Sequence, residues 1–551
     1  MKRSPKRNLP SSWKSKTDPD VDASGQRTGN LISLPYSRAL LFFAAPLFIM
    51  TVGFALRLYH LDSLSVWIDE ANSVRIAHMG FADMVSALAR DSSPPLYYLL
   101  LRFWMILFGE VPAAVRLLSV LFGTILVGYI FVVAYRFFSY RAGLVASLLM
   151  AVAPAQILHA QQCRMYTLLP LLALGAFHCL KMASDTESRT WLAGWAACMI
   201  GALYTHNYGW FLFPACFLIL LFNGSLKRRP WQWFGAAATV GIAYLPWSPI
   251  FWQQLQVSAQ NAWFEPIWNS LGPHGNLILT MDSFSGGRQS LSFTWEKPDA
   301  FRVARWFFFA AASVWSLVAV FHQGGDQNAR RHMTDVLIFL LVPLFTVILL
   351  SAFFSPIHRY GRSDQLVFPA FVILTAVGAD RLVRPLLCLG FTGLLILFSL
   401  ANYPPATADA SMRGDAEMAA KILALTDPDD AVLASSLTIG PLSYYARQAQ
   451  IPLQIVTFPR DNLKQHAISD KAAWLSRPGA LAEEAKAAMG EACRKTGPRG
   501  RLFVILGMEP FNQPLIDLLK QAHPSDMVLL PEIHTITITN RPVRILITVC
   551  P

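Results

Sequence analysis

The sequence predicts an all-α polytopic membrane domain of about eleven transmembrane helices, followed by a small extracytoplasmic α/β domain. Of its 551 residues, 54% are hydrophobic and 15% are charged, well below the roughly 25% charged residues of soluble domains. The apolar residues gather in runs of about 17–25, the length at which a helix crosses about 30 Å of hydrocarbon. After Asn402 the apolar content falls to a soluble level. These observations exclude a soluble enzyme, a disordered chain and a disulfide-rich miniprotein.

Basic residues outnumber acidic ones, 46 Lys and Arg against 34 Asp and Glu, for a formal net charge of +12. They gather in the short connections between apolar runs, which is the positive-inside pattern of membrane insertion rather than a nucleic-acid-binding surface. Residues 1–37 are polar and basic, and we expect a disordered cytoplasmic tail there. We expect membrane lipids and no nucleic acid as partners, and the inner membrane of a bacterium as the location.

The spans alternate consistently if the first apolar run, about 39–57, is an uncleaved anchor with its N-terminus inside. The stretch 94–109 is short for a span and holds Arg102 in its middle, so we expect a helix along the outer interface. A span at this point would put the basic residues Arg136 and Arg141 outside. The remaining spans are expected at about 113–136, 142–160, 166–182, 191–206, 208–223, 231–251, 303–322, 334–354, 365–380 and 385–401.

The membrane domain is expected over 38–401, with long outer loops at 58–112 and 252–302. A periplasmic α/β domain is expected over 402–551, because an odd number of spans leaves this part outside. In it, Asn540-Arg541-Pro542 predicts a turn between the last two strands. The strands are expected at Ala431–Ala434, Leu453–Phe458, Arg501–Leu506, Ile533–Thr539 and Val543–Val549, and helices at 413–425 and 514–522.

The seven cysteines show no CxxC pair and no Cys/His spacing typical of a metal site. Five of them lie in or beside apolar runs, where Cys behaves as a small hydrophobic residue. Cys493 and Cys550 belong to the polar C-terminal part and could pair in an oxidising periplasm, although the sequence does not establish that they are close.

Two acidic segments of the first outer loop are the most informative candidates for chemistry. The first is Ser65–Asn72, where Asp69 and Glu70 are adjacent and follow an interfacial Trp. Its plain alternative is a solvated loop in which an Asp caps a helix. The second segment places Asp91 three residues before Pro94-Pro95. Two rigid prolines begin a helix at the interface, and this geometry would hold Asp91 at the membrane depth of Asp69.

These segments belong to a series of four motifs, which are W-x-D-E at Trp67–Glu70, D-x-x-P-P-L-Y-Y at Asp91–Tyr98, R-L-x-S-x-x-x-G at Arg116–Gly123 and Q-x-x-R-x-Y at Gln161–Tyr166. The series resembles the GT-C membrane glycosyltransferases. The resemblance is greatest to the group of protein O-mannosyltransferases and lipid A aminoarabinose transferases, and it covers about 40–400. It implies a GT-C-like fold and transfer of a sugar from a polyprenyl phosphate to a lipid, glycan or protein acceptor outside the membrane.

The resemblance also implies roles for the acidic residues. The family's first-loop Asp is a general base, and this role maps onto Asp69, because a hydroxyl acceptor must lose its proton to become a nucleophile. A single carboxylate for the acceptor suits an inverting displacement. Glu70 is directed elsewhere and is expected to orient the site or contact the acceptor. Asp91 matches the family's second acidic position, but this chain has Ser93 where the family often has His. No cofactor or metal is predicted, and a divalent metal is left open.

The leaving lipid phosphate needs cationic or hydrogen-bond-donating groups on the outer loops. Arg164 and Tyr166 are one such pair. The outer turn holding His206 is expected to contact donor or acceptor, although a histidine at a helix end is also commonly structural. The segment 355–364 can also be an interfacial anchor, but Arg is suited to fork onto phosphate oxygens. From it we take His358, Arg359, Tyr360 and Arg362 as candidates.

The alternative function is a polytopic transporter or a flippase for lipid-linked glycans. Transporters usually carry ionisable residues or broken helices near the middle of the membrane, in repeated halves. In this chain the charged residues fall at the outer ends of spans, and no internal repeat is visible. The sequence therefore favours the transferase.

Overall fold

The chain divides into two compact units, residues 1–48 and 49–551. Of the first unit only the initial part of helix α1 (Tyr36–Leu58) is described, so the expected disordered tail falls almost wholly outside the described residues. The computed structural model describes residues 36–91, 93–260, 265–287, 299–322, 326–382, 384–401, 414–459, 477–498, 500–506, 512–522, 536–538 and 541–548.

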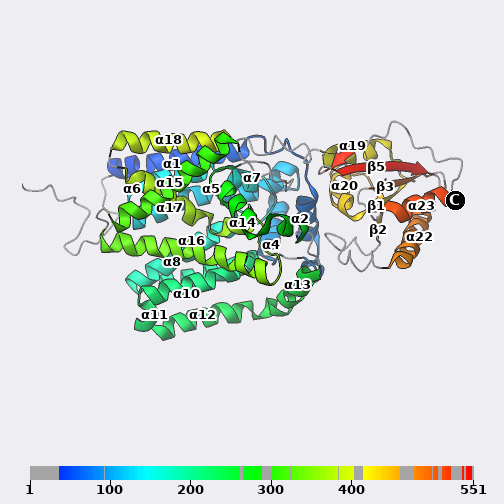
Figure 1. Cartoon of the computed structure of the whole chain (residues 1–551). Coiled ribbons are helices and arrows are strands. Elements are labelled where there is room, and N and C mark those ends of the chain that lie inside the picture. The colour runs from blue at the N-terminus through cyan, green and yellow to red at the C-terminus, as the bar shows by residue number, and fades with distance from the viewer. Residues whose placement is uncertain are drawn as a thin grey trace, which may run out of the picture. The chain divides into compact units, whose positions relative to one another are not determined.

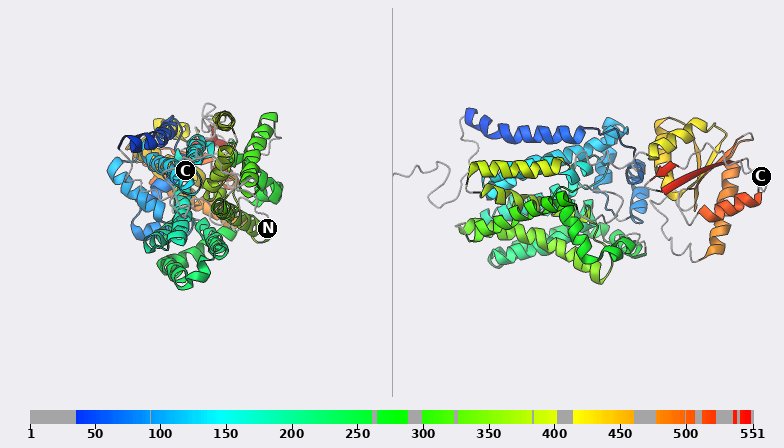
Figure 2. Two further views of the ribbon diagram at one scale, coloured as in Figure 1. Left: turned by 90° about the vertical axis from the view of Figure 1, so that its left-hand side faces the viewer. Right: turned by 45° about the horizontal axis from the view of Figure 1, so that its top comes forward.

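The described part of the expected membrane domain is built from helices, and the long ones run alongside one another as a bundle (Figures 1 and 2). A single large apolar core joins them, with small residues where helices approach closely. The helices are α5 (Pro112–Phe137), α6 (Tyr140–Val152), α7 (Pro154–Ala160), α8 (Leu168–Thr186), α9 (Arg189–Thr205), α10 (Leu212–Phe222), α11 (Ser225–Arg228), α12 (Pro230–Tyr244), α13 (Ser248–Gln260), α14 (Glu265–Phe284), α15 (Ala300–Phe321), α16 (Gln327–Phe353), α17 (Phe368–Asp380) and α18 (Pro385–Leu400).

Among the described residues, five helices are long and apolar enough to cross a membrane: α5, α8, α15, α16 and the run Pro230–Gln256. The pair α6 and α7 could form a sixth span, bent by 58°. Each expected span after the first coincides with a helix or a pair of helices, whereas the total of about eleven crossings stays a prediction. Shorter apolar helices are Phe42–Leu58, Leu96–Phe108, Asn207–Phe222, Phe368–Asp380 and Pro385–Leu400.

One expected span is interrupted in the structure, and another begins later than expected. The span expected at 142–160 breaks at Pro154, because proline lacks the N–H that would continue the helix and instead starts a new one. The span expected at 166–182 begins only at Leu168. Residues 161–167 therefore form an irregular turn between α7 and α8, and this turn carries Arg164 and Tyr166.

The two long outer loops are a correction to the sequence analysis, because both are largely helical. The loop expected at 58–112 holds α2 (Ile68–His78), α3 (Phe81–Leu88) and α4 (Leu96–Phe108). The loop expected at 252–302 holds the end of α13 and all of α14. The helix expected at 94–109 is present as α4, and Arg102 on it donates to the carbonyl oxygens of Ala77 and Met79 at the end of α2.

The C-terminal part forms a five-stranded sheet in the order β2-β1-β3-β5-β4 (Figure 1). Strand β1 runs parallel to β2 and β3, while β5 is antiparallel to β3 and β4. The five expected strands coincide with β1 (Ala431–Ser435), β2 (Gln454–Phe458), β3 (Leu502–Leu506), β4 (Ile536–Ile538) and β5 (Arg541–Thr548).

Helices cover both faces of this sheet. Ala431 and Leu433 of β1 pack against α22 (Pro478–Lys495) and α23 (Asn512–Ala522). Val432 and Ala434 point to the opposite face, where α19 (Gly414–Leu425) and α20 (Ser436–Gln448) lie. This alternation follows from the two-residue period of a strand. The sequence analysis did not predict α20 or α22.

The turn expected at Asn540-Arg541-Pro542 is wrong in part, because Arg541 and Pro542 already belong to β5. Strand β3 pairs only with Arg544–Thr548, so Pro542 lies where β5 has β4 alone as a neighbour and its missing N–H is tolerated. Cys493 on α22 is disulfide-bonded, and Cys550, with which it could pair, lies outside the described residues.

Candidate active site

The two adjacent carboxylates lie in the first turn of α2, where the helix dipole favours negative charge. Neither matches the solvated loop of the plain alternative, since Asp69 is 7% exposed and Glu70 is fully buried. Successive residues of a helix differ by about 100° in direction, so the two side chains point to different partners. The structure therefore separates their roles.

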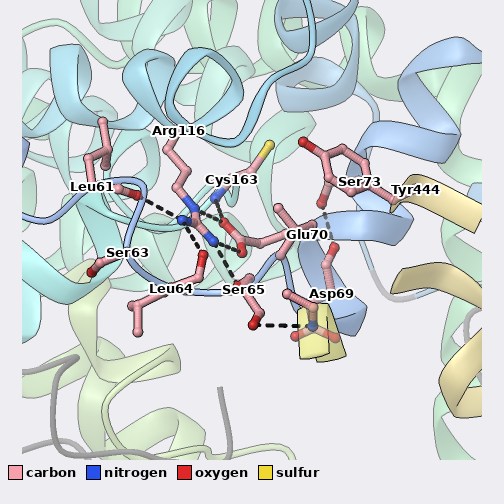
Figure 3. Close-up of polar contacts among 12 residues, drawn as sticks. Leu61, Ser63, Leu64, Ser65, Asp69, Glu70, Ser73, Arg116, Cys163 and Tyr444 are labelled. Atoms are coloured by element: carbon pink, nitrogen blue, oxygen red, sulfur yellow. Dashed lines mark hydrogen bonds and ion pairs between the residues drawn. The ribbon is translucent and has the colours of Figure 1, made fainter. Parts of the chain in front are cut away.

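Glu70 is held in a buried ion pair with Arg116 of α5 (Figure 3). Arg116 donates from Nε and Nη2 to the two carboxylate oxygens at 2.8 and 2.7 Å, a bidentate geometry. The backbone N–H of Cys163 donates to the same carboxylate at 2.8 Å. Of the two roles expected for Glu70, this arrangement fits orientation of the site and leaves no exposed surface for an acceptor.

Arg116 also fixes the backbone in front of α2. Its Nη1 donates to the carbonyl oxygens of Leu61 and Leu64 at 2.7 and 3.0 Å, and its Nη2 donates to that of Ser65 at 2.9 Å. The Glu70–Arg116 pair thus ties the segment 61–65, the start of α2, the turn at Cys163 and helix α5 into one element.

Asp69 points toward Arg362, whose Nη1 lies 3.7 Å from Oδ2 of the carboxylate. The Arg362 guanidinium also lies over two aromatic rings, at 5.8 Å from that of Trp67 and 5.9 Å from that of Tyr166. These are distances at which a cation is attracted to an aromatic face. The structure thus brings together three candidates that are far apart in sequence.

Arg164 extends this group toward the second acidic segment. Its guanidinium lies 5.7 Å from the Tyr166 ring, and Nη1 donates to Oγ of Ser73 at 3.3 Å and to the Tyr98 hydroxyl at 3.5 Å. The Tyr98 hydroxyl in turn donates to Oδ2 of Asp91 at 3.5 Å. Asp91 therefore connects to the arginine cluster through a tyrosine.

The charges of this cluster perturb its own titrating groups. Burial lowers the pKa of Arg164, but Tyr98, Tyr166 and Asp69 outweigh this effect and hold the pKa well above its ordinary value. Burial raises the pKa of the Tyr166 hydroxyl, but the charges of Arg362 and Arg164 lower it by a larger amount. The pKa of Tyr166 therefore lies below its ordinary value. Perturbed groups of this kind are typical of functional sites.

His206 lies at the end of α9, with its ring 6.4 Å from that of Tyr166 and stacked on Tyr208 at 4.3 Å. Its Nδ1 accepts from the backbone N–H of Tyr208 at 3.1 Å. Burial, followed by the charges of Arg164 and Arg359, lowers the pKa of His206 to about 3. The imidazole beside the cluster is therefore neutral at working pH.

The loop after α16 delivers Arg362 through a tight turn at Gly361. Gly361 has φ of 71°, in the left-handed region that favours glycine. Its carbonyl oxygen lies 2.6 Å from Nε2 of His159, and its N–H donates to Oδ2 of Asp364 at 2.8 Å. Tyr360 precedes this turn and interacts electrostatically with Arg362 and Asp282.

His358 does not join the cluster. It is fully buried, its Nε2 lies 3.3 Å from Oγ1 of Thr280, and its ring lies 6.0 Å from that of Trp268. His358 thus packs against α14, which the sequence analysis had treated as part of a loop.

Residues that the sequence analysis did not select complete the site. Trp67 and Tyr98 contact its arginines, Arg116 anchors Glu70, and His159 supports the Gly361 turn. Trp67, Tyr98 and Arg116 lie within the motifs quoted above, so the motifs could have identified them. His159 lies in an apolar run and has no such sequence signal. Among the described residues, no group of three or more His, Cys, Asp and Glu side chains could hold a metal ion.

Comparison with known proteins gives a match to a family model over part of the chain, and a fold. Residues 92–250 match the model of the dolichyl-phosphate-mannose-protein mannosyltransferase family. No curated protein matches the chain significantly. The structure is similar to that of ArnT from Cupriavidus metallidurans, solved in the apo state and with undecaprenyl phosphate bound. The TM-scores are 0.53 and 0.51 at 15% identity, over 93% of this chain and 98% of that one.

The structure is also similar to the oligosaccharyltransferase AglB from Archaeoglobus fulgidus, solved with an inhibitory peptide and a dolichol-phosphate. Here the TM-score is 0.51 at 11% identity, over 85% of this chain and 70% of that one. At such low identities the two similarities establish the fold. The resemblance read from the motifs is therefore confirmed: the chain has the fold of the GT-C membrane glycosyltransferases, and its residues 92–250 match the mannosyltransferase family model.

Proposed function

We propose that this protein is an integral-membrane glycosyltransferase that transfers a sugar from a polyprenyl-phosphate donor to an envelope lipid, glycan or protein. The observation that carries the proposal is the pairing of Asp69 with Arg362, next to Arg164, in a buried group. A base for the acceptor and cations for the leaving phosphate are the two requirements of this reaction. The polyprenyl phosphates bound in the ArnT and AglB structures are the lipid that would leave in this reaction, and they support a polyprenyl-phosphate-linked donor.

In the proposed reaction, Asp69 accepts the proton of the acceptor hydroxyl while the acceptor oxygen bonds to the anomeric carbon. The bond from that carbon to the phosphate oxygen breaks in the same displacement, with inversion, and its electron pair leaves on the lipid phosphate. Arg362, Arg164 and Arg359 are proposed to stabilise the phosphate charge. The neutral His206 is proposed to hydrogen-bond a sugar hydroxyl.

The remaining candidates take supporting roles in this proposal. Glu70 orients α2 through Arg116, and Asp91 contacts Tyr98, which lies beside Arg164. Tyr166 supplies the ring on which both arginines lie. His358 and Tyr360 support the loop that presents Arg359 and Arg362.

We also propose the orientation of the protein in the membrane. The basic tail 1–37 is placed in the cytoplasm, the domain 38–401 in the inner membrane, and the domain 402–551 in the periplasm. A reporter enzyme that folds only in the periplasm, fused after Asp415, tests this orientation. We expect activity from this fusion, and activity of a cytoplasm-only reporter at the same position would contradict it.

The transporter alternative is not favoured. The buried pair of Lys181 and Asp335 is a group of the kind that transporters use, but the two residues lie at the ends of the expected spans 166–182 and 334–354. Ionisable residues of transporters gather near the middle of the membrane. The matched family model is that of a mannosyltransferase, and AglB is an oligosaccharyltransferase by name.

Purified protein in detergent, supplied with polyprenyl-phosphate sugars and an extract of envelope lipids and glycans, tests the proposal. We expect release of free polyprenyl phosphate together with a glycosylated product detected by mass spectrometry. Flipping of the donor in reconstituted vesicles without any glycosylated product would contradict the proposal and support the alternative.

A further inference from the structure

The segment just before Asp69 is held by the C-terminal domain as well as by the membrane domain. The backbone N–H of Val66 donates to the hydroxyl of Tyr445 on α20 at 2.8 Å. The backbone N–H of Ala416 on α19 donates to Oγ of Ser65 at 3.3 Å. Figure 3 shows Ser65 with this bond on one side and the guanidinium of Arg116 on the other. Two residues are thus clamped between two domains.

Helix α20 packs directly on the first turns of α2. Gly440 faces α2 so closely that a Cβ added to it would lie 3.5 Å from Cβ of Ala71 and 3.8 Å from the carbonyl oxygen of Ile68. Tyr444 is fully buried and belongs to one apolar cluster with Val66 and Ala71. Its hydroxyl donates to the carbonyl oxygen of Glu110 at 2.6 Å. Helices α20 and α2 therefore form a close-packed interface, which restricts their movement relative to each other.

Asp69 follows Val66 by three residues and lies in the first turn of the helix that begins at Ile68. Any displacement of Val66 therefore moves the carboxylate relative to Arg362. Val66 is fully buried, so its N–H has no access to water if Tyr445 ceases to accept from it. An unpaired buried N–H is costly, and the segment is expected to shift until it finds another partner.

We propose that Tyr445 is a positioning residue for Asp69, and that the C-terminal domain completes the active site by holding the start of α2. This inference rests on the proposed function, in which Asp69 is the base. The reaction rate depends strongly on the position of a catalytic group, since a displacement of about 1 Å can reduce the rate by about 10²-fold. Tyr445 would act through the backbone of residues 66–69 and would touch neither donor nor acceptor.

The first test compares Tyr445→Phe with Tyr444→Phe in the full-length protein. Both changes remove one hydroxyl from the same helix, but only that of Tyr445 reaches the segment before Asp69. We expect Tyr445→Phe to reduce kcat about tenfold with an unchanged KM for the donor, below the ~10²-fold of a 1 Å displacement. Tyr444→Phe is expected to keep the wild-type kcat. Equal kcat values in the two variants would overturn the proposal.

A second pair of variants tests the packing. Gly440→Ala adds a Cβ at ordinary contact distance and is expected to be silent, whereas Gly440→Leu would push α20 away from α2. We expect Gly440→Leu to lose kcat at least as strongly as Tyr445→Phe while the protein remains folded by its melting curve. Full kcat in Gly440→Leu would overturn the proposal.

A double variant separates positioning from general stability. If Tyr445 acts through Asp69, adding Tyr445→Phe to Asp69→Asn should reduce the residual rate no further, because both changes remove one function. Additive losses would mean that Tyr445 acts elsewhere and would overturn the inference. Absence of transfer by the wild-type protein would instead count against the proposed function, so the two failures are distinguishable.

Discussion

Glu70→Gln tests the assignment of Glu70 as a structural anchor. The carboxylate accepts three hydrogen bonds, from Nε and Nη2 of Arg116 and from the Cys163 N–H, and it is fully buried. Glutamine keeps the shape but offers one acceptor oxygen, and its NH₂ group would face a donor. The variant therefore breaks the bidentate pair and leaves Arg116 as a buried cation without its counter-ion.

The magnitude follows from this loss. Removing one partner of a buried ion pair typically costs about 3–5 kcal/mol of folding free energy. Arg116 keeps its bonds to the carbonyl oxygens of Leu61, Leu64 and Ser65, which offset part of the loss. We therefore expect a value near the lower end of the range, about 3 kcal/mol.

The assay is the free energy of unfolding in mixed micelles, together with sugar transfer per folded molecule. Glu110→Gln is the control, since Glu110 is a partly exposed carboxylate beside His78 and Arg447 and should cost less than about 1 kcal/mol. Glu70→Gln with wild-type stability and no transfer would refute the assignment, because Glu70 would then act in the chemistry itself.

Two further predictions concern the loop after α16. Arg362→Gln should reduce transfer by about 10²–10³-fold. The loss should be larger than that of Arg359→Ala, because Arg362 lies 3.7 Å from Asp69. Unchanged donor KM and kcat in both variants would mean that this loop only anchors the protein at the membrane interface. Burial raises the pKa of Asp364 from 3.8 to about 6. The folded protein thus favours the neutral form of Asp364. The contribution of this form to stability is complete below about pH 4, where the carboxyl is neutral in both the folded and the unfolded protein, and it is lost as the pH rises through about 6. Asp364→Asn should therefore gain up to about 3 kcal/mol relative to wild type between pH 4 and pH 7, and an equal stability difference at both pH values would contradict it.

The sequence was sufficient for the helices of the membrane domain because a span must be long and apolar, and such runs are visible in any window. It was insufficient where polar sequence becomes helical. Ile68–His78 has no apolar periodicity, and its helix is stabilised by packing on α20 and by the Glu70–Arg116 pair. The break at Pro154 was missed because a proline within an apolar run can also kink a continuous helix.

The site was predictable in its residue types but not in its pairings. A carboxylate, arginines and a tyrosine on outer segments were expected, and the structure brings Asp69, Tyr166 and Arg362 together. The pairing of Glu70 with Arg116 joins residues 46 apart, and that of Val66 with Tyr445 joins residues 379 apart. Such contacts leave no local pattern, because only the packing of whole helices brings the partners close.

The central claim is that Asp69 is the general base, and one rate comparison tests it most directly. Asparagine keeps the size of Asp69 but cannot accept the proton of the acceptor. Transfer from a purified polyprenyl-phosphate sugar by Asp69→Asn is expected to fall about 10²–10⁴-fold, with wild-type melting behaviour. Asp62→Asn, which changes an exposed carboxylate of the same outer segment, should transfer at the wild-type rate. Transfer by Asp69→Asn at a rate close to that of Asp62→Asn would contradict the account and move the base to another residue.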